Sequence, residues 1–380
     1  MVPAGEFIMG IRIGRVFGIP IEIDYSWLLI FALFAYTVSA GHFGIYYPQL
    51  PRVYHFGLGI LTTLLFFASL VAHELAHSYF ARRSGIPIAG ITLFIFGGVA
   101  RMKAEPEKPS DELVMALAGP VFSFAAAITA WIISMLSPWM IVSAVFAYVA
   151  AANAIVATFN LIPGFPLDGG RVFRAIIWSL TRDLKLATRA ASISGQMFGW
   201  GLIALGFFAL VLGGSLSGVW FMFIGWFLNN AAQSSYHQLL MRRALEGVGV
   251  TEVMTPITEM VDARTSVGDL VRERFLRTHA DSYPVVSDTG ATGIVRIEDV
   301  RNIPHDKWST TAVGEITKPI TKECSISSDA DAWAAASMLS DTCPSKVVVY
   351  DDGSVVGTIG QENLARLLRT RAQLDIDEAA

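Results

Sequence analysis

Charged residues are scarce in this sequence. Asp, Glu, Lys and Arg make up 16% of the 380 residues, and hydrophobic residues make up 53%. Soluble globular proteins average about 25% charged and roughly 45–50% apolar residues. The mean hydropathy of +0.51 agrees with this difference. The composition argues against an ordinary soluble enzyme, and it excludes disorder for most of the chain.

Cysteine is also scarce. The chain has two cysteines, Cys324 and Cys343, and both lie in its C-terminal part. We therefore expect no disulfide framework, and we predict that this part of the chain lies in a reducing compartment.

The N-terminus lacks the pattern of a cleavable signal peptide. Its first apolar run follows Arg12 and Arg15 and is predicted to be a retained span. Residues 1–8 resemble an expression-vector remnant ahead of a natural start at Met9.

Charge is unevenly distributed along the chain. Residues 1–243 contain 15 Lys and Arg against 10 Asp and Glu, a net charge of +5. Residues 244–380 contain 13 against 22, a net charge of −9. An apolar, mildly basic block thus precedes an acidic, soluble-looking one. The acidic block lacks the clustered Lys and Arg of a nucleic-acid footprint, so we expect no nucleic-acid partner.

Long apolar runs dominate the first block. A membrane-spanning helix needs roughly 20 mostly apolar residues, and six stretches are too long and apolar for a soluble helix that packs on one face. The sequence therefore predicts a polytopic α-helical membrane protein with the lipid bilayer as a partner. The predicted spans are residues 25–40, 56–81, 112–136, 139–161, 191–213 and 217–240.

Basic residues outside these spans fall almost entirely on one side of the membrane. Fourteen lie on the side of the N-terminus, and Arg52 lies on the other. Because cytoplasmic loops carry an excess of Lys and Arg, we expect a multi-pass cell-membrane protein with both termini and the acidic block in the cytoplasm. The 14 residues are Arg12, Arg15, Arg82, Arg83, Arg101, Lys103, Lys108, Arg171, Arg174, Arg182, Lys185, Arg189, Arg242 and Arg243.

Two segments of the first block break the helical pattern. Residues 86–104 are apolar and β-branched, contain three glycines, and are too short for a span. They predict a β-hairpin lying against the membrane domain. Residues 160–170, NLIPGFPLDGG, interrupt a helix with two prolines and three glycines. Irregular backbone at membrane depth occurs only where it lines a cavity or is buried in protein.

The acidic block contains an internal repeat. Residues 250–257 align with 313–320 at an offset of 63, and residues 293–299 align with 357–363 at an offset of 64. This predicts two α+β units of about 60 residues each. The predicted organisation is a remnant at 1–8, a transmembrane domain at 9–243, repeats at 244–304 and 305–372, and a tail at 373–380.

A metal-binding pattern, His73-Glu-Leu-Ala-His77, lies near the cytoplasmic end of the second predicted span. On a helix, residues i and i+4 share one face, about 6 Å apart along the axis. Two imidazoles so placed can bind one zinc, and Glu74 between them can accept a proton from water. Chance matches are common on soluble helices. Inside an apolar span, however, ionisable residues are costly and indicate function.

A catalytic zinc site needs a third protein ligand and an open position. Asp168 lies in the glycine-rich break, where the irregular backbone lets a carboxylate approach the metal. The alternative is that Asp168 caps the helix that starts near Gly170. That role would account for the aspartate, but not for the two prolines and the apolar surroundings. His42 and His55 fall on the wrong side of the membrane in the predicted orientation, and His237 lies at a span end.

These motifs resemble the site-2 protease family of intramembrane zinc metalloproteases. HELAH in the second span and NLIPGFPLDGG after the fourth match its paired motifs, and Phe96-Gly97-Gly98 and Ala118-Gly119-Pro120 match as well. The resemblance implies one zinc held by His73, His77 and Asp168, with Glu74 as general base.

The same resemblance implies how a substrate is held. Asn160 would hold the backbone of a transmembrane protein substrate. The hairpin at Ile91–Gly98, with Phe96, Gly97 and Gly98, would offer it an edge strand, the strand before Gly97 being left free to pair. A transmembrane helix hides its peptide bonds, so the substrate must be unwound before cleavage.

The repeat in the acidic block resembles a tandem of cystathionine-β-synthase-type (CBS) domains, which implies an adenine-nucleotide sensor or a homodimer contact. The ligand motif G-x-x-[ST]-x-x-D keeps Asp299, but it has Arg296 at the hydroxyl position. The second copy has Gly360 and Asn363 instead. Two interpretations stay open: a nucleotide site at Asp299, or a structural and dimerising module without a ligand.

The function that the sequence predicts is an intramembrane zinc endopeptidase, with modulation through the CBS pair. The alternative is a membrane transporter or channel gated by CBS domains. A transporter of this kind is expected to show paired broken helices in inverted repeats, and the sequence has one break without a second copy. A catalytically dead scaffold would require a substituted ligand position, and none is substituted.

Overall fold

The computed structural model describes residues 10–373 apart from 96, 103, 257–258, 278–281, 288–289, 320–323, 342, 344–345 and 352–353. The predicted remnant at 1–8 and almost all of the predicted tail at 373–380 therefore lie outside the described residues. The chain divides into two compact units, the first ending at Leu240 and the second beginning at Met241. Each unit is described by itself.

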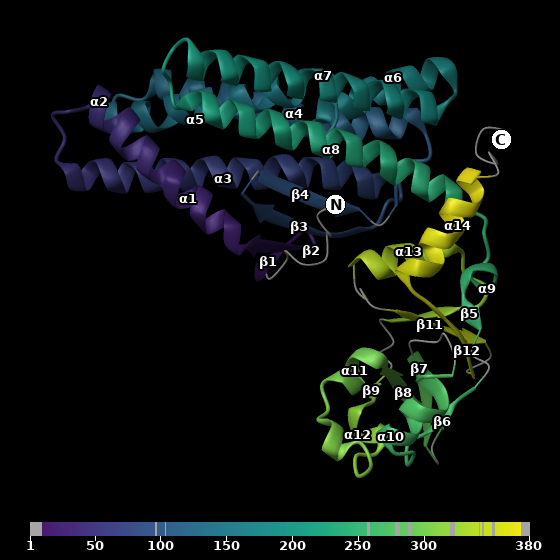
Figure 1. The fold of residues 1–380 in the computed structure, drawn as a ribbon. Helices are drawn as coiled ribbons and strands as arrows, with labels where there is room; N and C mark the ends of the chain where they lie inside the picture. The colour runs from purple at the N-terminus through teal and green to yellow at the C-terminus, as the bar shows by residue number, and fades with distance from the viewer. Residues whose placement is uncertain are drawn as a thin grey trace. The chain divides into compact units, whose positions relative to one another are not determined.

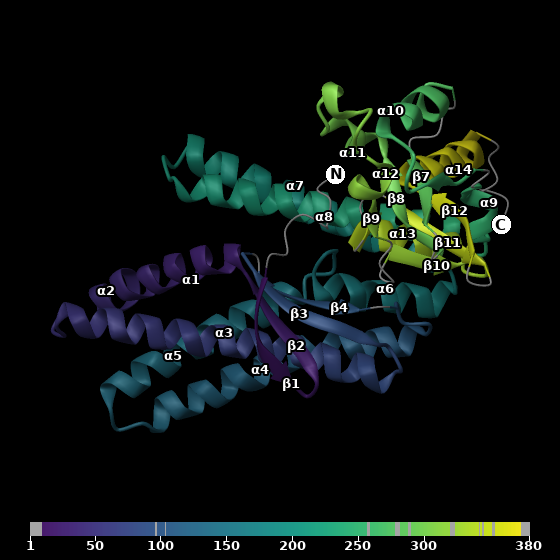
Figure 2. The same ribbon diagram turned by 90° about the horizontal axis from the view of Figure 1, so that it is seen from below.

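The first unit consists mainly of long apolar helices (Figures 1 and 2). Five helical segments of the described chain are long and apolar enough to cross a membrane. The first segment, Tyr25–Tyr46, joins α1 (Tyr25–Thr37), the π-helical turn η1 (Val38–Phe43) and α2 (Gly44–Tyr46). The others are α3 (Arg52–Arg83), α4 (Pro109–Leu136), α5 (Met140–Asn160) and α7 (Leu184–Val211).

The sixth predicted span forms part of one helix, α8 (Ser217–Leu245). This helix is outside the set that is apolar enough to cross a membrane, because Asn229, Asn230 and Gln233 interrupt its apolar sequence. These amides bond within the helix: the Gln233 Nε2 donates to Asn229 Oδ1, and the Asn230 Nδ2 donates to the Trp226 carbonyl. A sixth span therefore stays a prediction.

Small residues allow these helices to approach closely. A Cβ atom on Gly199 of α7 would lie 2.7 Å from the carbonyl oxygen of Gly225 in α8, and one on Gly206 would lie 2.4 Å from that of Gly218. Lipid is as apolar as leucine, so burial in a membrane adds little attraction between helices, and close van der Waals packing through small residues replaces it.

A four-stranded sheet lies along α3 in the first unit (Figure 1). Its strands follow the order β1-β2-β3-β4. The β2–β3 pair is parallel, and the other two pairs are antiparallel. The bounds are β1 (Gly10–Val16), β2 (Ile19–Asp24), β3 (Ile88–Phe94) and β4 (Gly97–Met102).

Two expectations from the sequence need correction here. The hairpin expected within residues 86–104 forms as β3 and β4, but the run after Arg15 is not the start of a span. It completes a second hairpin, and α1 begins only at Tyr25, where the Asp24 carboxylate accepts a hydrogen bond from the Ser26 backbone N–H at 2.8 Å. Because β2 pairs with β3, the strand before Gly97 has no free edge. Among the described strands of this sheet, the free edges belong to β1 and β4.

The second unit contains two sheets with the same design, a parallel pair followed by antiparallel neighbours. The first is β6 (Val261–Asp262), β7 (Ser282–Ser287), β8 (Gly290–Arg296) and β9 (Lys318–Pro319). The second is β10 (Ser325–Ser327), β11 (Val347–Asp351), β12 (Ser354–Ile359) and β5 (Thr255–Pro256). The helical segments are α9 (Val250–Val253), α10 (Val267–Leu270), η2 (Val271–Phe275), α11 (Ile297–Arg301), η3 (His305–Lys307), α12 (Val313–Ile316), α13 (Ala332–Asp341) and α14 (Gln361–Gln373).

In each sheet the last strand comes from the other sequence repeat. β5 lies in the first predicted repeat but pairs with β12 of the second, and β9 lies in the second but pairs with β8. The repeat-aligned glycines Gly293 and Gly357 allow this exchange. A Cβ atom on either would lie 2.3 Å from an atom of the incoming segment, the Lys318 carbonyl oxygen or the Met254 Sδ. The sheets therefore do not follow the predicted boundary between residues 304 and 305.

The two cysteines are the other correction in the second unit. Cys324 and Cys343 form a disulfide with Cα atoms 5.7 Å apart, where the sequence analysis expects reduced thiols. Cys343 is buried in the core that the second sheet forms with α13 and α14, and Cys324 packs against that core. The bridge closes a loop across this core.

Candidate metal centre

Three ionisable side chains from two helices meet inside the first unit. His73 and His77 lie on α3, and Asp168 is the first residue of α6 (Asp168–Thr181). The His73 Nε2 lies 3.1 Å from the His77 Nε2, and each Nε2 lies 3.2 Å from the Asp168 Oδ2. Tetrahedral zinc ligands at about 2.0–2.1 Å from the metal lie about 3.3 Å from one another. The three atoms are therefore spaced as three ligands of one zinc.

Neighbouring groups orient the two imidazoles. The Nδ1 of His77 lies 2.7 Å from the Met115 carbonyl oxygen, so this nitrogen carries the proton and donates it. The Nδ1 of His73 lies 2.9 Å from the Ser123 hydroxyl. The Met115 carbonyl therefore leaves the His77 Nε2 unprotonated toward Asp168, and the Ser123 hydroxyl can accept from the His73 Nδ1 in the same way. A second partner of this kind is what fixes a metal-binding histidine.

Gly119 of α4 leaves space beside these atoms. A Cβ atom at this position would lie 2.2 Å from the His77 Nε2 and 2.5 Å from the His73 Nε2. A side chain here would stand where the two nitrogens converge, so the site is shaped to hold another atom between them. The donor set and this space fit a zinc ion.

The break between α5 and α6 brings Asp168 to this point. A Cβ atom on Gly169 would lie 2.4 Å from the backbone of Leu161, and one on Gly170 would lie 2.4 Å from the backbone of Gly164 and Phe165. The chain therefore folds back on itself only because these two residues lack side chains, and the first turn of α6 can enter the membrane domain at the level of the histidines.

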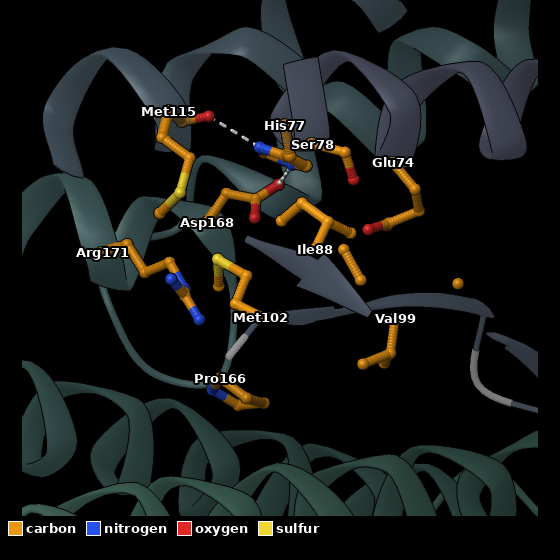
Figure 3. Close-up of a pocket in the computed structure, with 12 residues that line it drawn as sticks. Glu74, His77, Ser78, Ile88, Val99, Met102, Met115, Pro166, Asp168 and Arg171 are labelled. Carbon is orange, nitrogen blue, oxygen red and sulfur yellow. Dashed lines mark hydrogen bonds and ion pairs between the residues drawn. The ribbon is translucent and has the colours of Figure 1, made fainter. Parts of the chain in front are cut away.

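A pocket opens at the metal-ligand cluster, and Glu74 lines it together with His77 and Asp168 (Figure 3). Strand β4 forms another part of its lining, and Pro166 and Arg171 contribute from the break and from α6. Asn160, the last residue of α5, places its Nδ2 3.4 Å from the His73 Nε2. The structure thus brings Glu74 and Asn160 to the three candidate ligands.

The two glycines of the hairpin, Gly97 and Gly98, are required for different structural reasons. Gly97 has φ of +126°, which side chains rarely adopt. A Cβ atom on Gly98 would lie 2.6 Å from the Glu74 Cγ, so Gly98 lets β4 pass close to the candidate base. Phe96, the third predicted hairpin residue, lies outside the described residues.

The rival histidines do not join the cluster. His42 packs among Phe43, Tyr46, Tyr47 and Tyr148, and the His55 Nε2 lies 3.0 Å from the Tyr47 carbonyl oxygen. His237 lies beside Tyr236. In the part of the chain that the structure describes, the three predicted ligands are the group that can hold a metal ion.

The sequence predicts Arg171 and Arg174 only as basic residues of the cytoplasmic side, and the structure gives each a distinct environment on α6. Arg171 lines the pocket, and its Nη1 is buried without a hydrogen-bond partner among the described residues. Arg174, three residues later, is buried and its Nε donates to the Glu112 Oε1 at 2.7 Å. The sequence places both arginines after LDGG, but it does not reveal which of them has an acidic partner.

Asp299, the predicted nucleotide contact, lies on α11 and is held by residues of the neighbouring strands β8 and β9. Its carboxylate accepts hydrogen bonds from Arg296, and the Lys318 Nζ lies 3.0 Å away. Burial alone would raise the pKa of the Asp299 carboxyl, but the bonds from Arg296 and Lys318 outweigh it and hold the pKa below its ordinary range. In the second copy, Asn363 bonds to the backbone of Gly360 and Val253.

Comparison with known proteins places this site in a family. The model of peptidase family M50 matches residues 61–143 and 137–205, and the CBS domain model matches residues 250–306. A Synechocystis sp. protein named "Putative zinc metalloprotease sll0528" is 31% identical over 97% of this chain and 98% of its own length. A Mycobacterium tuberculosis protein named "Putative zinc metalloprotease Rip3" is 32% identical over 94% and 92%.

A solved structure is also similar. The site-2 protease from Methanocaldococcus jannaschii has 27% identity and a TM-score of 0.43, over 60% of this chain and 95% of its own. The full-length relatives and the family model together define the class: this chain belongs to peptidase family M50, the site-2 protease family, and carries a CBS domain. The chain is therefore a membrane-protease homologue, which favours the predicted enzyme over the alternative CBS-gated transporter.

Proposed function

We propose that the protein is a zinc endopeptidase that cleaves transmembrane segments of membrane proteins. The observation that carries this proposal is the cluster of the His73 Nε2, the His77 Nε2 and the Asp168 Oδ2, spaced at 3.1–3.2 Å with Glu74 beside it. In this proposal the three side chains hold one zinc. When bound, zinc supplies a Lewis acid that polarises a peptide carbonyl and lowers the pKa of water.

The residues of the chain have distinct roles in this proposal. Glu74 accepts a proton from the attacking water and returns it to the leaving amine, and as it is not a ligand it remains free to do so. Met115 and Ser123 keep the Nε2 lone pairs of both histidines available. Asn160, close to His73, donates to the backbone of the substrate.

Strand β4 provides the second part of substrate binding. It is an edge strand, and Gly98, Val99 and Ala100 line the pocket beside Glu74. A substrate segment unwound from its helix has free peptide groups, and pairing with β4 would satisfy one side of them without demanding a sequence. Gly97 and Gly98 keep this edge close to Glu74 and accessible.

The membrane arrangement and the regulation are part of the same proposal. In this proposal both termini, the pocket side of α3 and the CBS unit lie in the cytoplasm, and the excess of basic residues on that side supports this orientation. The CBS unit continues directly from α8. A change in it, caused by a nucleotide or by pairing with a second copy, would act on cleavage only if it distinguishes two states of the membrane domain.

Glu74→Gln tests the proposed function. The full-length protein in detergent is mixed with a membrane-protein substrate whose transmembrane helix contains helix-breaking residues. We expect Glu74→Gln to retain zinc and to cleave about 10²–10⁴-fold more slowly than the parent. Glu107→Gln, which removes an exposed carboxylate in the loop before α4, is the matched control. Cleavage by Glu74→Gln at the rate of the control contradicts the assigned role.

A further inference from the structure

Arg171 lines the candidate site, and one of its donor groups has no hydrogen-bond partner among the described residues. It extends from α6 one turn after Asp168 and lines the same pocket as Glu74 and His77. Figure 3 shows it on the opposite side of Asp168 from Glu74. Its Nη1 is buried and has no hydrogen-bond partner among the described residues.

Among the described residues, no neighbouring acidic group accepts a hydrogen bond from this Nη1. The Arg174 Nε donates a hydrogen bond to the Glu112 Oε1, and the Arg174 Nη1 lies 3.7 Å from the Glu105 Oε2. A guanidinium keeps its charge at every physiological pH and has five N–H donors in a fixed plane. A buried donor of this kind is costly unless an acceptor reaches it, so the pocket is incomplete on this side until a molecule with an acceptor enters.

The strand that lines the same pocket indicates what that acceptor is. Gly98, Val99, Ala100 and Met102 of β4 line the pocket, and β4 is an edge strand. An extended peptide paired with β4 directs alternate carbonyl groups toward β4 and the others away from it. Apart from β4, the lining includes Pro166, which has no backbone N–H to donate, and Arg171, whose side chain has an unused donor.

We propose that Arg171 is a substrate-binding residue: its guanidinium donates to a main-chain carbonyl oxygen of the extended substrate segment, on the face turned away from β4. The inference rests on the proposed function, because it takes the substrate to be a peptide in this pocket. It assigns the pocket two sets of donors, the β4 backbone on one side and Arg171 on the other. Recognition of a backbone carbonyl is independent of the substrate side chains.

Peptide binding without turnover tests this directly. Full-length protein carrying Glu74→Gln is titrated in detergent with a fluorescent transmembrane peptide that contains helix-breaking residues. Adding Arg171→Met is expected to raise the Kd roughly 10- to 100-fold, the loss of one charge-assisted hydrogen bond. Adding Arg171→Lys is expected to raise it less. Arg189→Met, which removes an exposed guanidinium on α7, is the matched control and leaves the Kd unchanged.

A backbone substitution in the peptide identifies the acceptor. Replacing one amide by an ester makes the preceding carbonyl a weaker acceptor. The ester also removes the N–H of the same peptide group, which points toward β4, so some loss of binding is expected in every variant. At one position near the cleavage site the loss is expected to be clearly larger in protein that retains Arg171 than with Arg171→Met, and the difference reports the carbonyl contact. Equal Kd values for Arg171→Met and Arg189→Met would overturn the inference, and so would a loss of zinc from Arg171→Met. Cleavage of the peptide by Glu74→Gln would instead overturn the proposed function. The Kd values of Arg171→Met and Arg189→Met could still be compared, so the two failures can be told apart.

Discussion

Glu112 and Arg174 form a buried ion pair between the two helices that frame the candidate metal centre. Glu112 is fully buried, and Arg174 has 5% of its surface exposed. Glu112 lies on α4 one turn before Met115, whose carbonyl orients His77, and Arg174 lies on the same helix as Asp168. The pair therefore couples the position of one candidate ligand to the orientation of another.

Removing one partner of this pair leaves the other charge buried. We expect Arg174→Met to lower the free energy of unfolding by about 3–5 kcal/mol and to lower the zinc content with it. The double variant Glu112→Gln with Arg174→Met should recover much of the stability, since it leaves no unpaired charge. Thermal unfolding in detergent, followed together with metal content, measures both effects. A double variant no more stable than Arg174→Met would show that the pair is not the cause.

The second prediction concerns Gly119. A methyl group at this position would stand between the two Nε2 atoms, so Gly119→Ala should lose zinc while the helices remain formed. Gly201→Ala is the matched control, since Gly201 lies in α7 and a Cβ atom there meets nothing within 4 Å. Elemental analysis and circular dichroism of both purified variants make the comparison. Full zinc content in Gly119→Ala would place the metal elsewhere.

The part of the site that local patterns encode was predictable. The i, i+4 spacing of His73 and His77 places them on one helix face, and the glycines after Asp168 permit the tight return of the chain. These inferences need only helix geometry and the properties of glycine. Arg171 was not predictable in the same way, because the sequence does not say that Arg174 bonds to Glu112, a contact across 62 residues, while the Arg171 Nη1 stays without a hydrogen-bond partner among the described residues.

The sheet and the repeats show where local patterns end. Residues 19–24 alternate as a strand does, but they directly precede the predicted span at 25–40, and the local sequence does not show that they pair with a distant strand. Which strand has a free edge depends on the pairing of Ile21 with Ile91, 70 residues apart. The repeat offset locates the two copies, but it does not show that β5 pairs with the sheet of the second copy and β9 with the sheet of the first. The expectation of reduced cysteines rests on the cellular compartment. Their pairing depends instead on how the core around β11, β12, α13 and α14 brings Cys324 and Cys343 together.

The third prediction concerns Asp299. Because Arg296 and Lys318 lower the pKa of this carboxyl in the folded state, the charged form contributes stability above the unfolded pKa of about 3.9, and this contribution is lost as the pH falls through the folded pKa. Asp299→Asn should therefore lower the melting temperature of the second unit at pH 7. The difference from the parent should shrink as the pH approaches the lowered pKa.

The same contacts bear on nucleotide binding. Arg296 and Lys318 already occupy the Asp299 carboxylate, so a ribose hydroxyl would have to displace them. We expect titration of the full-length protein with ATP, ADP and AMP to show no saturable binding at this carboxylate. Saturable binding that Asp299→Asn abolishes would instead assign the position to a ligand.

Metal content is the most direct test of the central claim, that His73, His77 and Asp168 hold one zinc. The parent and Asp168→Ala are purified without added chelator and measured by elemental analysis, with Asp183→Ala as a control that removes the exposed N-cap of α7. We expect about one zinc per chain in the parent and the control, and a large loss in Asp168→Ala. A parent without zinc, or equal zinc in all three proteins, would contradict it.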